Sequence, residues 1–169
     1  AASASQEGRF SHPQWWIDKL HSQYPEKWEQ ILAAGNQHPP MTLRVNNRKT
    51  SVESYLRQLA EAGIDAHAVG ASGILLERPL AVDRLPGFSQ GLVSVQDGGA
   101  QLAARLLDVQ DGMRVLDACA APGGKTAHLL ELADLELTAV DIDAERLQRV
   151  EDNLTRLSLQ ARLLQADAE

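Results

Sequence analysis

The sequence predicts an α/β protein in which a small α+β domain precedes the first part of a doubly wound parallel sheet. From about residue 97 onward, apolar runs of strand length alternate with amphipathic helical segments, which is typical of a parallel sheet with crossover helices. Before that point one strand, one helix and several short strands follow one another. A chain of 169 residues is long enough for a small domain and part of another.

Residues 1–10 are small and polar, and they predict a linker or tail. The first domain is expected over residues 11–95. It opens with two short helices between residues 11 and 36, the first capped by Ser11 and the second closed by Gly35. This lead-in holds three tryptophans, Trp15, Trp16 and Trp28. Packing anchors for a small unit are a more ordinary role for them than a base-stacking surface.

The rest of this domain predicts a strand, a helix and more strands. Residues 42–46 alternate apolar and polar side chains, as a half-buried strand does. Thr50 and Glu53 predict a capping box for a helix that Gly63 closes. Short strands are expected at about 65–69, 74–78 and 92–96. The topology is compatible with an RNA-recognition-like domain, but its aromatic signature is absent, so any RNA contact here would rely on charge and shape.

The second domain, residues 96–169, has the rhythm of a Rossmann-like sheet. Helices are expected at 98–107, 124–133 and 144–158, and strands at 113–118, 136–141 and 161–166. Three strands are too few for a doubly wound sheet with both faces covered, so only the N-terminal part of this domain is expected. An unpaired edge and an uncovered apolar face favour self-association. Gly98 and Gly99 loosen the start of the first helix by roughly 1 kcal/mol each relative to alanine.

Charge and composition narrow the classes of partner. The net charge is −7, but residues 1–60 carry seven Lys/Arg against five Asp/Glu, a balance of +2, while residues 61–169 carry nine against eighteen, a balance of −9. The first part offers four basic residues to phosphates, Arg44, Arg48, Lys49 and Arg57, although an ordinary solvated surface explains them equally well. The single cysteine rules out an internal disulfide and a multi-cysteine zinc site, so no metal is expected. With no membrane span and no signal peptide, a cytoplasmic protein is expected.

The stretch Asp117–Thr126, DACAAPGGKT, carries the chemistry. It lies where a predicted strand turns into a helix, and ligands of open α/β sheets bind beyond the carboxyl ends of the strands. A P-loop is disfavoured because Cys119 stands where its first glycine is required. No register supplies the G-x-G-x-x-G of a dinucleotide site.

S-adenosylmethionine (SAM) fits this loop better because it carries no phosphate. It needs a loop that accepts an amino-acid tail and an acidic residue at the end of the next strand. Asp141 ends the second strand, where its carboxylate can accept both ribose hydroxyls. Asp167 follows the third strand and can accept from the adenine amino group, whereas Asp143 is expected to cap the following helix.

These motifs closely resemble bacterial Sun/Fmu-type 16S ribosomal RNA cytosine-C5 methyltransferases, within the wider Nol/Nop/Sun family. The matching segments are Asp117–Thr126, His12-Pro13, Asn36-Gln37 with Pro39-Pro40, Leu85–Phe88 and Val95–Asp97. The resemblance implies a Rossmann-like SAM-dependent methyltransferase domain preceded by a small RNA-recognition-like domain, with 16S rRNA as partner. It implies cofactor contacts from Cys119, Ala120, Ala121, Pro122, Gly123, Gly124, Lys125, Asp141 and Asp167.

The resemblance also implies covalent catalysis, in which a cysteine thiolate adds to C6 of cytosine so that C5 can attack the SAM methyl group. The family's nucleophile sits in a Thr-Cys-Ser motif, which is expected beyond Glu169, so no catalytic residue is expected in this chain and the chain alone is expected to be inactive. Cys119 falls on the cofactor loop instead. The incomplete sheet predicts weak or no SAM affinity. A non-catalytic SAM- or RNA-binding module and a SAM enzyme with a different acceptor remain the alternatives.

Overall fold

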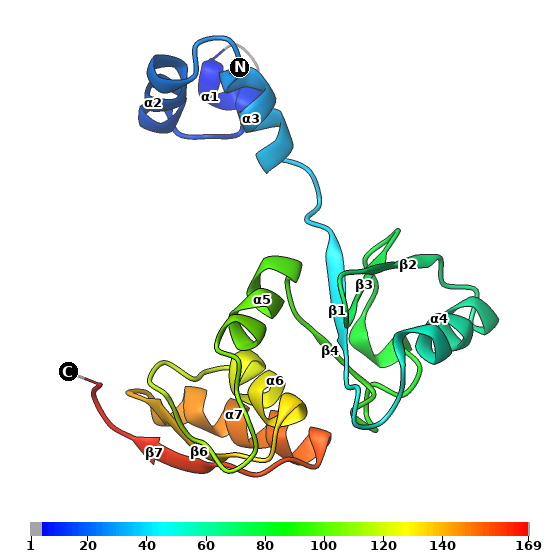
Figure 1. Ribbon diagram of the computed structural model, residues 1–169. Coiled ribbons are helices and arrows are strands. Elements are labelled where there is room, and N and C mark those ends of the chain that lie inside the picture. The colour runs from blue at the N-terminus through cyan, green and yellow to red at the C-terminus, as the bar shows by residue number, and fades with distance from the viewer. Residues whose placement is uncertain (1–4, 169) are drawn as a thin grey trace. The chain divides into compact units, whose positions relative to one another are not determined.

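Figure 1 shows the computed structural model, which describes residues 5–168. Residues 1–4, part of the expected linker, lie outside the described residues. The chain divides into two compact units, Ala1–Pro39 and Pro40–Glu169. In the part of the chain that the structure describes, no helix is long and apolar enough to cross a membrane.

The first unit contains three short helices, α1 (Gln6–Phe10), α2 (Gln14–Gln23) and α3 (Trp28–Gly35). Its small core consists of Phe10, Ile17, Leu20 and Leu32. The two helices expected in the lead-in are therefore confirmed, and the second ends at the expected glycine. Trp16 and Trp28 pack against this core as anchors, but Trp15 is 65% exposed.

Two expectations for this unit are wrong. Residues 6–10 form a helix rather than a tail, because Ser5 caps it and Phe10 packs edge-to-face on Trp28, with ring centroids 5.0 Å apart. Ser11 does not cap the next helix. It adopts a left-handed conformation that ends α1, and α2 begins after Pro13.

The second unit opens with an antiparallel sheet whose strands lie in the order β2-β3-β1-β4. Its elements are β1 (Met41–Val45), α4 (Val52–Glu61), β2 (Ala66–Val69), β3 (Gly73–Leu76), a 3-10 helix η2 (Val82–Arg84) and β4 (Val93–Val95). Helix α4 covers one face, where Tyr55 and Leu59 are buried against Leu43 and Val45 of the central strand. The predicted α+β domain is confirmed.

The helix cap in this sheet domain differs by one residue from the expected one. The hydroxyl of Ser51, not Thr50, accepts a hydrogen bond from the N–H of Ser54 at 3.1 Å. Both residue types cap helices well, so the sequence did not distinguish the two adjacent positions. Gly63 ends the helix as expected, with φ of 71°.

A parallel sheet follows, with strands in the order β5-β6-β7. Its elements are α5 (Gly98–Leu106), β5 (Arg114–Asp117), α6 (Gly124–Leu132), β6 (Glu136–Asp141), α7 (Ala144–Leu157) and β7 (Arg162–Gln165), which confirms the predicted alternation. The start of α5 is held despite its two glycines, because the Asp97 carboxylate accepts from the N–H of Ala100 at 3.1 Å.

The three helices α5, α6 and α7 lie on one face of the parallel sheet (Figure 1). The core of this region draws on all of them and on β6: Ala104, Leu129, Leu130, Leu137, Ala139, Val150, Leu154 and Leu157. On the opposite face Leu116 and Leu164 are 65% and 42% exposed. Among residues 5–168, no helix covers that face, as the small number of strands predicts.

Candidate functional site

The candidate site lies at the carboxyl edge of the parallel sheet. Because the strands are parallel and in register, with Asp117 opposite Ala139 and Asp141 opposite Gln165, their carboxyl ends reach the same edge. The loop of residues 119–125 follows β5 at this edge.

The loop is fixed by a glycine that no other residue replaces without strain. Gly123 has φ of 95° and stands at the N-cap of α6, where no side chain caps the helix. A Cβ atom at this position would lie 3.2 Å from both Cα and Cγ1 of Val150 on α7. The backbone therefore approaches the neighbouring helix as closely as a glycine allows, and the start of α6 stays open to a ligand.

Further hydrogen bonds hold the loop against the sheet and α7. The N–H of Ala120 donates to the carbonyl oxygen of Val140 at 2.9 Å, and the Asn153 side chain donates to the carbonyl oxygen of Pro122 at 2.9 Å. At the base of the loop, the hydroxyl of Thr126 donates to the Asp117 carboxylate at 2.6 Å. These hydrogen bonds hold the loop to β6, α7 and the end of β5.

Asp141 is in direct contact with this loop. One carboxylate oxygen accepts from the N–H of Ala121 at 3.1 Å, and the other accepts from the N–H of Asp143 at 3.2 Å. The side chain is only 2% exposed, and Arg146 lies 3.7 Å from it. The carboxylate therefore ties the loop to the second strand. Asp143 caps α7 as expected, accepting from the N–H groups of Glu145 and Arg146.

The carboxyl of Asp141 is ionised across the physiological range. Burial raises its pKa, but hydrogen bonds from the backbone of Asp143 and Ala121, together with the charge of Arg146, outweigh burial, so that the net pKa lies below the ordinary value. The group is consequently an acceptor only, which suits it to hydroxyl donors.

Asp167, Cys119 and Lys125 lie on the surface of the same region, whereas Ala120 and Gly123 are buried. Asp167 is exposed and follows the end of β7 by two residues. Cys119 and Lys125 are exposed on the loop, and the thiol of Cys119 is free. The cofactor roles of all nine predicted residues remain a prediction.

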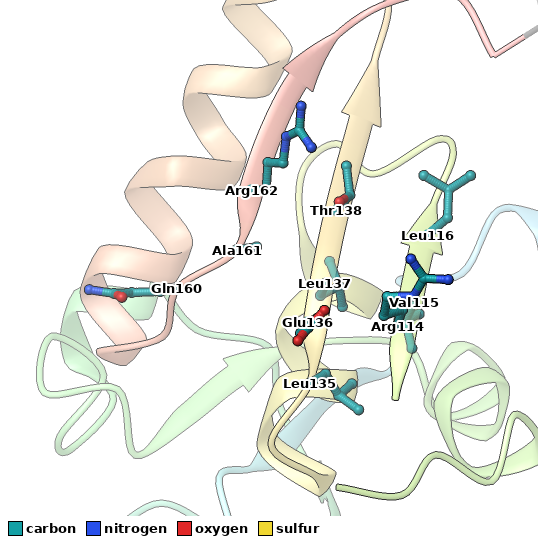
Figure 2. A pocket seen from close by; sticks show the side chains of 10 residues that line it. All are labelled: Arg114, Val115, Leu116, Leu135, Glu136, Leu137, Thr138, Gln160, Ala161 and Arg162. Carbon is teal, nitrogen blue, oxygen red and sulfur yellow. The ribbon is translucent and has the colours of Figure 1, made fainter. Parts of the chain in front are cut away.

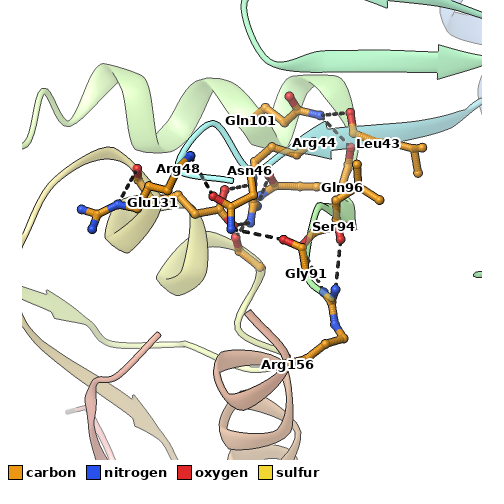
Figure 3. Close-up of polar contacts among 12 residues, drawn as sticks. Leu43, Arg44, Asn46, Arg48, Gly91, Ser94, Gln96, Gln101, Glu131 and Arg156 are labelled. Atoms are coloured by element: carbon orange, nitrogen blue, oxygen red, sulfur yellow. Dashed lines mark hydrogen bonds and ion pairs between the residues drawn. The ribbon is translucent and has the colours of Figure 1, made fainter. Parts of the chain in front are cut away.

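The basic residues expected to meet phosphates are mostly engaged inside the second unit, which corrects that interpretation. Arg44 is completely buried, and its guanidinium donates to the Glu131 carboxylate at 2.7 and 2.9 Å, as Figure 3 shows. Arg48 donates to the Glu131 carbonyl oxygen and the Asp134 carboxylate. Lys49 donates to the carbonyl oxygen of Gln90 at 2.8 Å. Arg57 alone of the four pairs only within its own helix, with Glu53.

These contacts pack the second face of the antiparallel sheet against the helices of the parallel-sheet region. Thr42 and Arg44 of β1, and Asn46 directly after it, point away from α4 and are nonetheless at most 8% exposed. Arg156 of α7 completes the contact by donating to the carbonyl oxygens of Phe88 and Val93. The part of this face formed by β1 is therefore closed to stacking bases, whereas His67 of β2 on the same face is exposed. The sequence did not reveal this contact, because Arg44 alternates with the apolar residues of β1 as a solvent-facing residue would.

His128 is a buried ionisable group beside this contact. It is 2% exposed, and no described residue provides a hydrogen-bond partner for its Nδ1 atom. Burial, and next the charges of Arg44 and Arg105, lower the pKa of His128 from 6.5 to about 4. The imidazole is therefore neutral in the folded protein near pH 7.

A pH dependence of stability follows from this lowered pKa. The unfolded chain binds a proton near pH 6.5, whereas the folded chain does so only near pH 4. The contribution of neutral His128 to the free energy of unfolding is therefore complete above pH 6.5 and is lost as the pH falls. The loss is about 2 kcal/mol between pH 7 and pH 5. Urea unfolding at pH 7 and pH 5 measures this difference. A His128→Leu variant should lose this difference, and variant His67→Leu, which alters an exposed histidine, should keep it. An unchanged difference in His128→Leu would show that the imidazole is not its source.

Two hollows of the second unit lie away from the candidate site. One, of about 750 Å³, runs along the three parallel strands between Arg114 and Arg162; the residues that line it are drawn in Figure 2. Another, of about 930 Å³, runs along α7 and β7. Neither is lined by the loop or by the predicted aspartates, so both are distinct from the candidate site.

Comparisons with known proteins match both halves of this arrangement. Residues 12–83 match the model of the RsmF/B-like methyltransferase ferredoxin-like domain, and residues 104–169 match that of the 16S rRNA methyltransferase RsmB/F family. Ribosomal RNA small subunit methyltransferase B from Pseudomonas syringae pv. tomato is 52% identical over 95% of the chain. The protein of the same name from Serratia proteamaculans is 49% identical over 98% of the chain. The chain spans 37% and 39% of these relatives' lengths.

Solved structures agree on the fold. A methyltransferase homolog protein from Pyrococcus horikoshii superimposes on 96% of this chain with a TM-score of 0.82 and 29% identity, and the match covers 55% of that protein. NSun6 from Pyrococcus horikoshii superimposes on 92% of the chain with a TM-score of 0.78, and the match covers 66% of that protein. At 17% identity the second match supports the fold alone.

Proposed function

This chain belongs to the RsmB/F family of 16S rRNA methyltransferases, and on that premise we propose that the loop of residues 119–125 binds SAM together with Asp141 and Asp167. The observation that carries the proposal is the contact between the Asp141 carboxylate and the loop N–H of Ala121, at 3.1 Å. It unites the two sequence features that a SAM site requires, a small-residue turn and an acid at the next strand end.

The residues present fit this cofactor. Gly123 lets the loop pack closely against Val150 of α7, and the uncapped start of α6 presents N–H donors toward a carboxylate tail. Asp141 is an ionised acceptor for hydroxyl groups. When bound, SAM supplies an electrophilic methyl group. The NSun6 structure from Pyrococcus horikoshii, which shares this fold, is one with SFG.

We further propose that the whole protein methylates C5 of a cytosine in 16S rRNA in the cytoplasm. A cysteine thiolate adds to C6, the resulting carbanion at C5 takes the methyl group, and loss of the C5 proton expels the thiolate. Cys119 lies on the cofactor loop, away from this role, so the nucleophile belongs to the part of the relatives that this chain does not span. In this proposal the chain supplies the cofactor half of the site.

Removal of the Asp141 carboxylate tests the proposal. We expect equilibrium dialysis with methyl-labelled SAM to show binding weaker than micromolar for the chain, because one wall of the site is open. Asp141→Ala should weaken this binding at least tenfold, since hydrogen bonds to a charged group contribute about 1.5–3 kcal/mol. The matched control is Asp65→Ala, which removes an exposed carboxylate from the antiparallel sheet domain.

The ligand can be varied in the same experiment. A SAM analogue without the ribose hydroxyls should bind the parent protein more weakly than SAM does. In the Asp141→Ala variant, the analogue and SAM should bind with the same weak affinity. If the analogue and SAM bind the parent protein equally, Asp141 does not contact the ribose, and the proposed site is wrong in that respect.

A further inference from the structure

Helix α6, which follows the cofactor loop, is held at both ends by one side chain from the other sheet. The guanidinium of Arg44 donates through Nη1 to the carbonyl oxygen of Gly124, the first residue of the helix, at 2.8 Å. Through Nε and Nη2 it donates to the two carboxylate oxygens of Glu131, one residue before the helix ends. Gly124 and Glu131 are seven residues apart and lie on the same side of the helix. The guanidinium and the Glu131 side chain together thus bridge two turns of the helix.

Burial and further hydrogen bonds hold the guanidinium of Arg44 in one orientation. The side chains of Arg44 and Glu131 are 0% and 4% exposed, so water does not compete for their hydrogen bonds. The fourth contact of the guanidinium, from Nη1 to Oε1 of Gln96, is 2.6 Å long (Figure 3). Gln101 in turn donates to the carbonyl oxygen of Gln96 at 3.0 Å, so that the acceptor segment is itself fixed. The planar fork of arginine satisfies all these acceptors at once, which a lysine ammonium does not.

The contact reaches the cofactor loop through one peptide unit. Gly124 follows Gly123, whose left-handed backbone turns the loop into the helix. The carbonyl of Gly124 points toward Arg44, whereas the N–H groups at the start of α6 point the other way, toward the loop side. Any shift of α6 along its axis would move these donors relative to Asp141, which is fixed on β6.

We propose that Arg44 is a positioning residue for the cofactor loop, so that the ferredoxin-like domain presets the SAM half-site of its neighbour. Arg44 acts through Gly124 and makes no contact with the ligand itself. The identity of the ligand rests on the function proposed above, but the positioning of the loop does not.

A purely structural role for the buried ion pair is the competing explanation, and one double variant separates the two. Arg44→Met combined with Glu131→Leu removes both charges, and apolar replacements of a buried pair commonly preserve stability. It also removes the hydrogen bond to Gly124. The matched variant Glu131→Gln keeps Arg44 and its bonds to Gly124 and Gln96.

Amide hydrogen exchange of the ligand-free chain is the readout. The N–H groups of Ala120, Ala121 and Gly123 all donate hydrogen bonds, so their exchange rates report opening of the loop. After each rate is referred to the global unfolding equilibrium of the same variant, we expect about tenfold faster exchange at these amides in the double variant. In Glu131→Gln they should exchange at the parent rate.

Parent-like exchange at the loop in the double variant would overturn the proposal, whatever its global stability. Faster exchange spread equally over β5, β6 and α7 would also overturn it, because the effect would then be general loosening. SAM dialysis on the same samples is the second readout, with at least tenfold weaker binding expected for the double variant. If the parent chain binds no SAM at all, the function proposed above fails, while the exchange experiment still decides the positioning role.

Discussion

Replacing Arg44 by methionine is expected to lower the free energy of unfolding by about 3–5 kcal/mol, because it leaves the Glu131 carboxylate buried without its partner. Few single substitutions reach this magnitude. Both side chains lie almost entirely out of water, so the charge that remains on Glu131 is not solvated. Urea denaturation of the chain and of Arg44→Met at pH 7 measures the difference.

Arg48→Met provides the matched control for this large effect. Arg48 reaches the same helix end, but its ion pair with Asp134 is 2.7 Å long between side chains that are 39% and 79% exposed. Exposed ion pairs contribute about 0–1 kcal/mol, so this variant should remain close to the parent. Equal losses in the two variants would mean that burial does not determine the strength of the contact.

Gly123→Ala is expected to destabilise the chain by about 2–4 kcal/mol and to abolish detectable SAM binding. The alanine must either adopt φ near 95° or move, and its Cβ would lie 3.2 Å from two atoms of Val150. Moving the backbone would displace the start of α6 from Asp141. Urea denaturation and SAM dialysis measure the two consequences separately.

Gly112→Ala separates backbone strain from crowding. Gly112 has φ of 80°, similar to that of Gly123, but a Cβ atom there would meet nothing within 4 Å. This control should lose only about 1–2 kcal/mol from the left-handed conformation and should retain SAM binding. If Gly123→Ala were no more destabilising than Gly112→Ala, the close approach of α6 and α7 would have no energetic importance.

The sequence predicted the architecture of the second unit well, because its signals are local. The period of the apolar residues in α4 and α7, and the short apolar runs of β5 and β6, identify each element without knowledge of its neighbours. Helix boundaries were less certain where equivalent residues adjoin, as at Thr50 and Ser51. The helix at residues 6–10 was missed because its one buried residue, Phe10, finds its partner Trp28 eighteen residues away.

The sequence predicted that the loop and Asp141 lie together, as their hydrogen bond shows, whereas the cofactor roles of these residues remain a prediction. Parallel strands place Asp141 beside the loop by topology alone, and the sequence shows both. The burial of Arg44 depends instead on Glu131, 87 residues further along the chain. Charge counting therefore offered a phosphate-binding or an ordinary solvated role for Arg44, whereas pairing across the two sheets decides its role.

A heteronuclear NMR titration of the chain with millimolar SAM shows where SAM binds, since it detects weak binding and locates it. If the loop binds SAM together with the two aspartates, the shifted amide signals cluster at residues 119–125, Asp141 and Asp167. Shifts centred instead on the hollow between Arg114 and Arg162, or an unchanged spectrum at millimolar ligand, would contradict it.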